Sequence, residues 1–359
     1  MLFDASTFRD LVSGKRRGVL PAMTRCALAV AEVPYSLVVV RRNRRFDSGR
    51  TEITRVGVPV ISVGNITLGG TGKTPVVEWL ARWFRQRGVR VCIISRGYGA
   101  EEGSRNDEAL ELEQKLPDVP HVQNPNRVEA AQMAIEEFET QLILLDDAFQ
   151  HRRIHRDLNI VLLDALEPFG FDHVFPRGTL REPLAGLSRA DVVCLTRADM
   201  LSVDERQQIR MRVERMRPDV PWVELSHAPR ALLVWRGEEQ PIESLRKKQV
   251  AAFCGIGNPA GFRHTLDTCG YEVAAWREFP DHHNFTRDDV DSLAAWATDH
   301  AAGEGISAVV CTHKDLVKIQ SRELGETPLV ALGIGIDLLA GGELIDACLT
   351  PLLPPTPPS

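Results

Sequence analysis

The segment from residue 58 to residue 75 constrains the fold more than any other part of the chain. An apolar run, residues 58–63, leads into a glycine-rich turn, and Gly72-Lys73-Thr74 then opens a stretch with helical periodicity. Glycines let main-chain N–H groups converge on a polyphosphate, and the amino end of a helix adds partial positive charge. A strand, such a turn and a helix in this order predict a P-loop NTPase-like α/β fold, with a mostly parallel sheet and helices on both faces.

Individual residues of this turn have separate expected tasks. Lys73 would bridge the β- and γ-phosphates of a nucleoside triphosphate, and the Thr74 hydroxyl would ligate Mg²⁺. Pro75 suits the first helical turn, where a main-chain N–H has no partner in any case. Thr67 stands where the usual pattern has glycine. The residues expected to bind the nucleotide are Thr67, Gly69, Gly70, Thr71, Gly72, Lys73 and Thr74.

A second expected strand, residues 141–145, is apolar from Leu142 onward and leads into the acidic pair Asp146-Asp147. P-loop sites hold their metal from a carboxylate at the end of a neighbouring strand, so this pair is the predicted Mg²⁺-side acid. The pattern leaves open which of the two contacts the metal. Further strands are expected at residues 89–95, 158–164 and 191–195, with helices at 75–87 and 127–138.

The chain is expected to divide into a large domain, a smaller one and an arm. We predict an N-terminal arm over residues 1–50, a P-loop core over 51–235, a linker over 236–248, a smaller C-terminal α/β domain over 249–350, and a disordered proline-rich tail over 351–359.

Charge is distributed unevenly between the arm and the body. Residues 1–50 carry ten Lys and Arg against four Asp and Glu, whereas the whole chain has a net charge of −6 and gives no indication of nucleic-acid binding. An apolar segment, residues 27–40, runs into Arg41, Arg42, Arg44 and Arg45. Such a segment can lie in the headgroup layer of an anionic membrane, and it can equally be a packed helix with a solvated basic end.

The same arm contains no uninterrupted apolar run of the length that a membrane-spanning helix needs. The longest candidate, residues 19–40, is interrupted by Arg25, Glu32 and Pro34. We therefore expect a protein that is neither secreted nor membrane-spanning.

Taken together, these motifs resemble the tetraacyldisaccharide 4′-kinase family of lipid A biosynthesis, in which threonine also replaces the first glycine of the loop. The resemblance extends from the basic arm to about residue 318 and is carried by Val63-Gly64-Asn65-Ile66-Thr67 with the turn to Pro75, Ser95-Arg96-Gly97-Tyr98-Gly99, Asn106-Asp107-Glu108, Asp146-Asp147-Ala148-Phe149-Gln150-His151-Arg152, Leu180-Arg181-Glu182-Pro183-Leu184, Phe279-Pro280-Asp281-His282-His283 and Thr312-His313-Lys314-Asp315.

The resemblance implies an ATP- and Mg²⁺-dependent kinase that phosphorylates the 4′-hydroxyl of a tetraacyldisaccharide 1-phosphate. It also implies a peripheral enzyme on the cytoplasmic face of the bacterial inner membrane. Its partners would be the acylated lipid substrate and an anionic membrane surface, and no obligate protein partner is evident.

The resemblance also assigns roles by position. Asp107 matches the base that takes the proton of the sugar hydroxyl, with His282 of the second domain as its partner. Arg181 and Glu182 match active-site residues whose separate roles stay open. Without the resemblance, Asp107 is one acid among several on a polar stretch. His282 and His283 could then be half of a metal site, but no other His or Cys cluster has the spacing to complete it, and a loop histidine before a capped helix is more often structural.

Three residues depart from the family pattern: Ala148 replaces a glycine, Thr179 a proline, and His313 a glutamate. His313 leaves the role of its motif open.

Two other functions are compatible with the P-loop. A kinase of a soluble metabolite would not need the apolar-basic arm. A switch-type NTPase would read its base from residues 195–199, but Leu195-Thr196-Arg197-Ala198-Asp199 lacks the Asn-Lys pair of such proteins.

Overall fold

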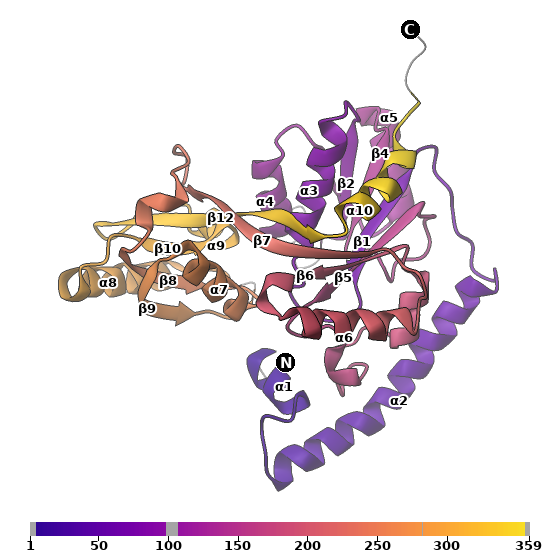
Figure 1. The fold of residues 1–359 in the computed structure, drawn as a ribbon, viewed down its shortest axis with the longest axis horizontal. Helices are drawn as coiled ribbons and strands as arrows, with labels where there is room; N and C mark the ends of the chain where they lie inside the picture. The colour runs from indigo at the N-terminus through magenta and orange to yellow at the C-terminus, as the bar shows by residue number, and fades with distance from the viewer. Residues whose placement is uncertain (1–4, 98–106, 282, 356–359) are drawn as a thin grey trace. The chain divides into compact units, whose positions relative to one another are not determined.

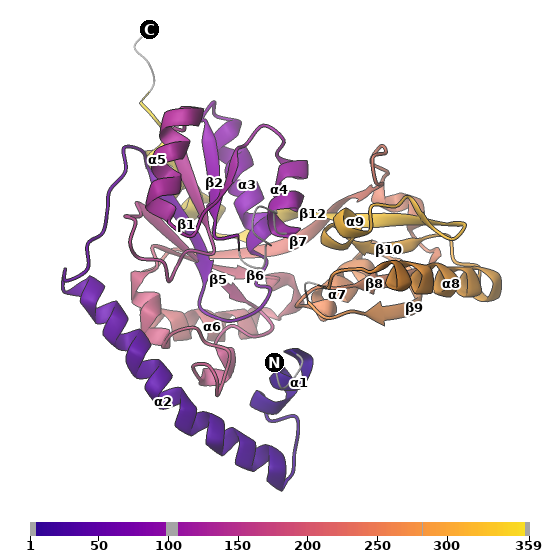
Figure 2. The ribbon, with the colours of Figure 1, turned by 180° about the vertical axis from the view of Figure 1, so that it is seen from behind.

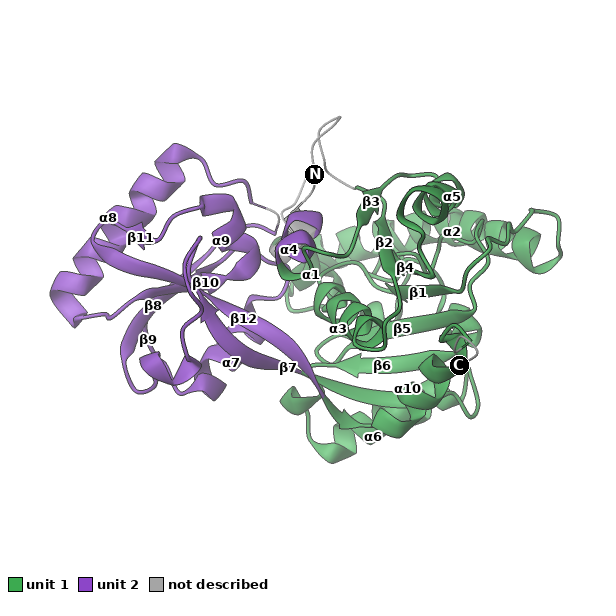
Figure 3. Cartoon of the chain, turned by 90° about the horizontal axis from the view of Figure 1, so that it is seen from above, with its two compact units in different colours: residues 1–105, 115–226, 338–359 green, residues 106–114, 227–337 purple. Residues whose placement is uncertain are grey.

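The computed structural model describes residues 5–97, 107–281 and 283–355, and shows alternating strands and helices (Figure 1, Figure 2). The chain divides into two compact units (Figure 3). Unit 1 comprises residues 1–105, 115–226 and 338–359, and unit 2 comprises residues 106–114 and 227–337. The predicted domains followed the chain without interruption, whereas here the segment from residue 106 to 114 groups with unit 2 and the C-terminal residues group with unit 1.

The sheet of unit 1 is parallel, as predicted, in the strand order β3-β2-β4-β1-β5-β6-β7. Its strands are β1 (Val60–Asn65), β2 (Val91–Ser95), β3 (His121–Gln123), β4 (Leu142–Asp146), β5 (Leu158–Asp164), β6 (Val192–Thr196) and β7 (Trp222–Leu233), the last of which continues into unit 2. Strand β1 lies between β4 and β5, so the loop after β1 and the acids after β4 leave neighbouring strands at the same edge.

Helices cover both faces of this sheet. Unit 1 contains the helices α1 (Ala5–Val12), α2 (Val19–Asp47), α3 (Lys73–Arg85), α5 (Arg127–Phe138), α6 (Val203–Glu214) and α10 (Gly342–Leu349), of which α3 and α5 pack on opposite faces of the sheet. Alternate strand residues Cys92, Ile94, Ile143 and Leu145 pack against the alanines of α5. Helix α3 packs on β1, β2 and β4 from the opposite side through its buried face (Figure 1, Figure 2). Because side chains alternate along a strand, each strand supplies both cores.

Unit 2 is also built from strands and helices, and its strands follow the order β12-β10-β8-β9. Its elements are α4 (Asp107–Lys115), β8 (Gln249–Cys254), α7 (Pro259–Cys269), β9 (Glu272–Glu278), α8 (Arg287–Glu304), β10 (Val309–Thr312), α9 (His313–Ile319), β11 (Glu323–Leu324) and β12 (Thr327–Ala340). Thr286 and Asp289 form the predicted capping box of α8.

Helix α2 is one continuous helix of 29 residues that contains Arg25, Glu32 and Pro34. By length and composition alone it could cross a membrane, with a mean hydropathy of 1.4 over its most apolar window. Length and composition alone do not place the helix in a membrane, so the expectation that this protein does not span one stays a prediction. Figure 1 and Figure 2 show it running along the outside of unit 1.

Candidate active site

The P-loop joins β1 to α3. Asn65 ends the strand, and its side-chain amide donates to the main-chain oxygen of Thr67 at 2.8 Å. Gly72 precedes Lys73, the first residue of α3, with a left-handed φ of 76°. Gly69 has a φ of 112°. Residues with side chains rarely adopt such conformations, so these two glycines allow the turn that directs the loop toward the amino end of α3.

Two residues at the end of β6 contact the loop, Thr196 as the last residue of the strand and Arg197 directly after it. The Thr196 hydroxyl donates to the main-chain oxygen of Thr71 at 3.0 Å, and Arg197 donates to that of Gly70 at 3.1 Å. Arg197 also forms an ion pair with Asp164 at 2.8 Å. From the sequence, residues 195–199 are interpreted only as a possible base-reading strand. No local pattern indicates that their side chains contact the P-loop.

Asp147 lies between two cations at the mouth of the loop. Its Oδ1 is 3.7 Å from Lys73 Nζ, and Arg181 donates to Oδ1 and Oδ2 at 2.8 and 2.9 Å. Burial raises the pKa of this carboxyl, but the charges of Lys73 and Arg181 outweigh it and hold the pKa below its usual range. Asp147 is therefore ionised at neutral pH, the form in which a carboxylate can bind a cation.

The two candidate acids have different surroundings. Asp146 is the buried last residue of β4, whereas the Asp147 side chain is 37% exposed and has a left-handed φ of 49°. A Cβ on Gly64 would lie 2.7 Å from Phe149, so glycine at this position lets β1 approach the turn after β4. The positive φ falls on Asp147 and not on Ala148, so alanine is accommodated where the family pattern has glycine.

Leu180 and Arg181 pair with the start of the loop through their main chains. Thr67 forms a β-bridge with Leu180, and the Arg181 main-chain N–H donates to Ile66 O at 2.7 Å. Arg181 then reaches Asp147, but the fully buried Glu182 points elsewhere and accepts hydrogen bonds from Asn43, Gln150 and Arg189. Arg181 and Glu182, which the sequence analysis treats as one pair, therefore belong to different clusters.

Arg9 of α1 also reaches the loop. A Cβ on Gly69 would lie 2.5 Å from its Nη2, so the guanidinium packs directly on this glycine. Sequence reasoning counted Arg9 only as one charge of the basic arm. The contact adds a positive charge beside the loop, although Arg9 precedes it by about sixty residues in the chain.

Basic side chains also surround His151. Burial, followed by the charges of Arg127, Arg156, Arg153 and Arg96, lowers the pKa of His151 to about 4. Its imidazole is therefore neutral at physiological pH and lies in a positive field. Burial and Arg96 lower the pKa of Arg127, and Asp146 and Asp147 oppose this shift. This field would attract an anionic group beside the acids after β4.

The predicted base and its partner are not both described. Asp107 is the first residue of α4, but its side chain lies outside the described part of the chain, as does the whole of His282. The adjacent His283 lies 3.0 Å from Asp289 of the α8 capping box. Their roles remain predictions.

The motif Thr312-His313-Lys314-Asp315 builds the start of α9. Asp315 is buried and accepts from the Thr312 hydroxyl at 2.6 Å and from the main-chain N–H of Gly255. His313 is buried, with Nε2 3.1 Å from Gln114 Oε1. Burial raises the pKa of Asp315. These contacts indicate a local structural role within unit 2.

The four arginines predicted to face a membrane, Arg41, Arg42, Arg44 and Arg45, are exposed on the last turns of α2. Within the described residues, no three His, Cys, Asp or Glu side chains cluster in a way that could hold a metal by themselves. A P-loop metal site does not require such a cluster, because a hydroxyl, a carboxylate and phosphate oxygens suffice.

The chain is similar to known proteins over nearly its whole length. The family model described as tetraacyldisaccharide-1-P 4′-kinase matches residues 24–350. A tetraacyldisaccharide 4′-kinase of Anaeromyxobacter dehalogenans (strain 2CP-C) is 37% identical over 355 residues, covering 93% of this chain and 92% of that protein. One of Geobacter sulfurreducens is 34% identical over 342 residues, covering 90% and 92%.

A solved structure is similar as well. The crystal structure of LpxK from Aquifex aeolicus in complex with ATP matches with a TM-score of 0.72 and 30% identity, covering 92% of this chain and all of that one. The predicted fold class, family and enzyme class are thereby confirmed. This chain belongs to the tetraacyldisaccharide-1-phosphate 4′-kinase family.

Proposed function

We propose that this protein transfers the γ-phosphate of ATP to the 4′-hydroxyl of a tetraacyldisaccharide 1-phosphate at a membrane surface. The observation that supports this most is the Lys73–Asp147–Arg181 group at the mouth of a P-loop, in a chain of this family. Phosphoryl transfer needs in-line positioning and neutralisation of charge more than covalent chemistry, and this group supplies fixed charge at the required place.

The residues at the loop would divide the work. Lys73 and Arg181 would balance the charge that develops on the transferred group, and the main-chain N–H groups of the loop would hold the phosphates. The ionised Asp147 and the Thr74 hydroxyl offer the oxygen ligands that Mg²⁺ prefers. When bound, Mg²⁺ would neutralise charge on the phosphate oxygens. Which carboxylate contacts it, Asp147 or Asp146, belongs to the proposal, and the ion pairs favour Asp147.

The proton of the acceptor hydroxyl needs a base. By position in the family motif, Asp107 would accept it, and His282 would orient the carboxylate and share the proton.

Helix α2 supports a peripheral attachment to the cytoplasmic face of the membrane, where ATP is available. Apolar side chains are strongly exposed along it: Val19, Leu20, Met23, Val30, Val33, Leu37 and Val38. Its middle is tied to unit 1, because Glu32 accepts from the Val174 N–H at 2.7 Å and lies 3.1 Å from His173 Nδ1. A helix held along its length by polar contacts suits the headgroup layer better than a transmembrane path.

Transfer of labelled γ-phosphate tests the proposal directly. Mg²⁺, labelled ATP and tetraacyldisaccharide 1-phosphate in mixed micelles should yield a labelled bisphosphorylated lipid, and both Lys73→Ala and Asp107→Ala should lose this product. If transfer survives Asp107→Ala unchanged, the kinase stands and the proposed base is wrong. If ATP is hydrolysed without any labelling of the lipid, the proposed reaction is wrong.

A further inference from the structure

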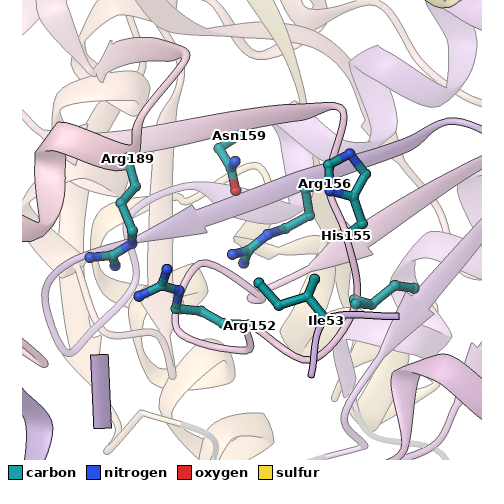
Figure 4. Close-up of a pocket in the computed structure, with 7 residues that line it drawn as sticks. Ile53, Arg152, His155, Arg156, Asn159 and Arg189 are labelled. Atoms are coloured by element: carbon teal, nitrogen blue, oxygen red, sulfur yellow. The ribbon is translucent and has the colours of Figure 1, made fainter. Parts of the chain in front are cut away.

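A basic pocket on unit 1 is lined in part by the segment that joins β4 to β5. It has a volume of about 230 Å³ and is lined by Ile53, Arg152, Ile154, His155, Arg156, Asn159 and Arg189. The lining contains three guanidinium groups and no carboxylate. Figure 4 shows the guanidinium ends of Arg152, Arg156 and Arg189 converging. The pocket has room for a phosphate group and several waters, each of which takes about 30 Å³ in the liquid.

Two of these arginines pair with carboxylates that do not line the pocket. Arg152 pairs with Asp47 of α2 at 2.6 Å and donates to Asn43 O at 3.1 Å. Arg189 pairs with the buried Glu182 at 2.7 Å. The buried Nε atoms of Arg152 and Arg189 have no hydrogen-bond partner among the described residues. Both guanidinium groups therefore keep donor capacity beyond their ion pairs.

Arg156 is different from the other two. Its Nη1 donates to the main-chain oxygens of Ala148, Phe149 and His151 at 3.0–3.2 Å. Within the described part of the chain it forms no ion pair with a carboxylate. Burial, and then the charges of Arg189 and Arg152, lower its pKa to about 10, against the weaker opposing effect of Glu182 and Asp191. The pocket thus holds one more positive charge than its partners neutralise.

Converging like charges are unfavourable unless an anion lies among them, and guanidinium groups present paired donors that match phosphate oxygens. We propose that this pocket binds a phosphate group, separately from the P-loop, through Arg152, Arg156 and Arg189. The phosphate can belong to a phospholipid headgroup or to free inorganic phosphate. Arg152 contacts the basic end of α2, so binding of a lipid headgroup rests on the proposed attachment of α2 to the membrane. Binding of free phosphate does not depend on that attachment.

Ile53 allows a test that leaves all three arginines in place. It lines the pocket, is 40% exposed and lies outside any helix or strand. Ile53→Glu would give the pocket a carboxylate of its own and compete with phosphate. Ile53→Gln is the neutral control of the same size. Thr51→Glu adds the same charge nearby on a residue that does not line the pocket.

In the first arm, thermal unfolding is followed with and without millimolar inorganic phosphate, with a saturating non-hydrolysable ATP analogue occupying the P-loop. Phosphate should raise the midpoint of the wild type, Ile53→Gln and Thr51→Glu by a few degrees, as expected for a ligand about tenfold above its Kd. Ile53→Glu should show no phosphate-dependent shift, and its midpoint without phosphate should exceed that of Ile53→Gln.

In the second arm, the same proteins are sedimented with phosphatidylglycerol–phosphatidylcholine vesicles. If a lipid headgroup is the source, Ile53→Glu should bind several-fold more weakly than Thr51→Glu; if free phosphate is the source, the two should bind equally and only the first arm should respond. The proposal is overturned if neither arm distinguishes Ile53→Glu from its controls. Lipid phosphorylation by the same preparations is scored separately, so failure of the kinase reaction would not be mistaken for failure of this site.

Discussion

The adjacent residues Arg181 and Glu182 belong to two clusters in which a carboxylate meets basic or polar side chains, but the two carboxylates differ in how far they are open to solvent. Around Asp147, two cations meet one carboxylate that is partly exposed to solvent. Around Glu182, a carboxylate with no solvent exposure is saturated by Asn43, Gln150 and Arg189. A carboxylate whose partners are all protein groups supports structure, whereas one that faces excess cations in an open site is available to a metal or a substrate.

The largest expected effect is on stability at the closed cluster. Glu182→Ala would leave the charge of Arg189, whose side chain is 18% exposed, without its partner, and breaking such a buried pair costs about 3–5 kcal/mol. Urea unfolding of the wild type and the variant measures the loss. Asp147→Ala at the open cluster is the matched control and should cost much less. Equal losses in the two variants would remove the distinction between the clusters.

At the open cluster, the main effect should be on the rate of transfer. Lys73→Ala removes a charge that stabilises the transition state, and losses of such groups lower kcat about 10²–10³-fold. The free energy of unfolding should change little, because Asp147 keeps Arg181 as a partner. Initial rates of lipid phosphorylation and urea unfolding of the same preparation test both parts. A rate that stays within twofold of the wild type would contradict the role assigned to Lys73.

The acid limb of the pH–rate profile tests the electrostatics of Asp147. Its pKa is lowered in the folded protein, so its ionised form, and the stability that its ion pairs contribute, are fully present at neutral pH. Both are lost as the pH falls below the usual range of an aspartate and through the lowered folded pKa. Arg181→Gln removes one of the two cations, so its acid limb should begin at a higher pH than that of the wild type. Measuring kcat from about pH 3 to about pH 7, which extends to both sides of the ordinary carboxyl pKa of about 4, would reveal the shift, and coincident limbs would contradict the assignment.

The smallest expected effect concerns the contact of α2 with the closed cluster. Asn43→Ala removes the 2.8 Å hydrogen bond to Glu182 Oε2, which keeps Arg189 as its other donor, so the expected cost is that of one hydrogen bond, about 1 kcal/mol. Tyr35→Phe, which removes an exposed 3.5 Å contact to Arg181 O on the same helix, is the control and should cost less than about 0.5 kcal/mol. If Asn43→Ala is as mild as Tyr35→Phe, α2 does not support this cluster.

Local patterns were sufficient for much of the fold. The apolar run of β1, the glycines of the turn and the helical periodicity after Lys73 are encoded within about 25 residues, and the structure has these elements in the predicted order. The capping box of α8 is equally local, because Thr286 and Asp289 are three residues apart. The continuity of α2 through residues 19–40 is not local in this sense, because Arg25 and Glu32 find their hydrogen-bond partners elsewhere on unit 1.

The amino-acid sequence by itself determined the P-loop, the acids after β4, the parallel α/β architecture and the family, since each depends on residue types at short or regular spacing. Tertiary structure alone decided that Asp147 faces Lys73, that Arg181 and Glu182 separate into different clusters, and that Arg9 and Arg197 reach the loop. These contacts join segments tens to more than a hundred residues apart. Their partners are set by which strands are neighbours in the sheet and where each strand ends, and no local pattern records either.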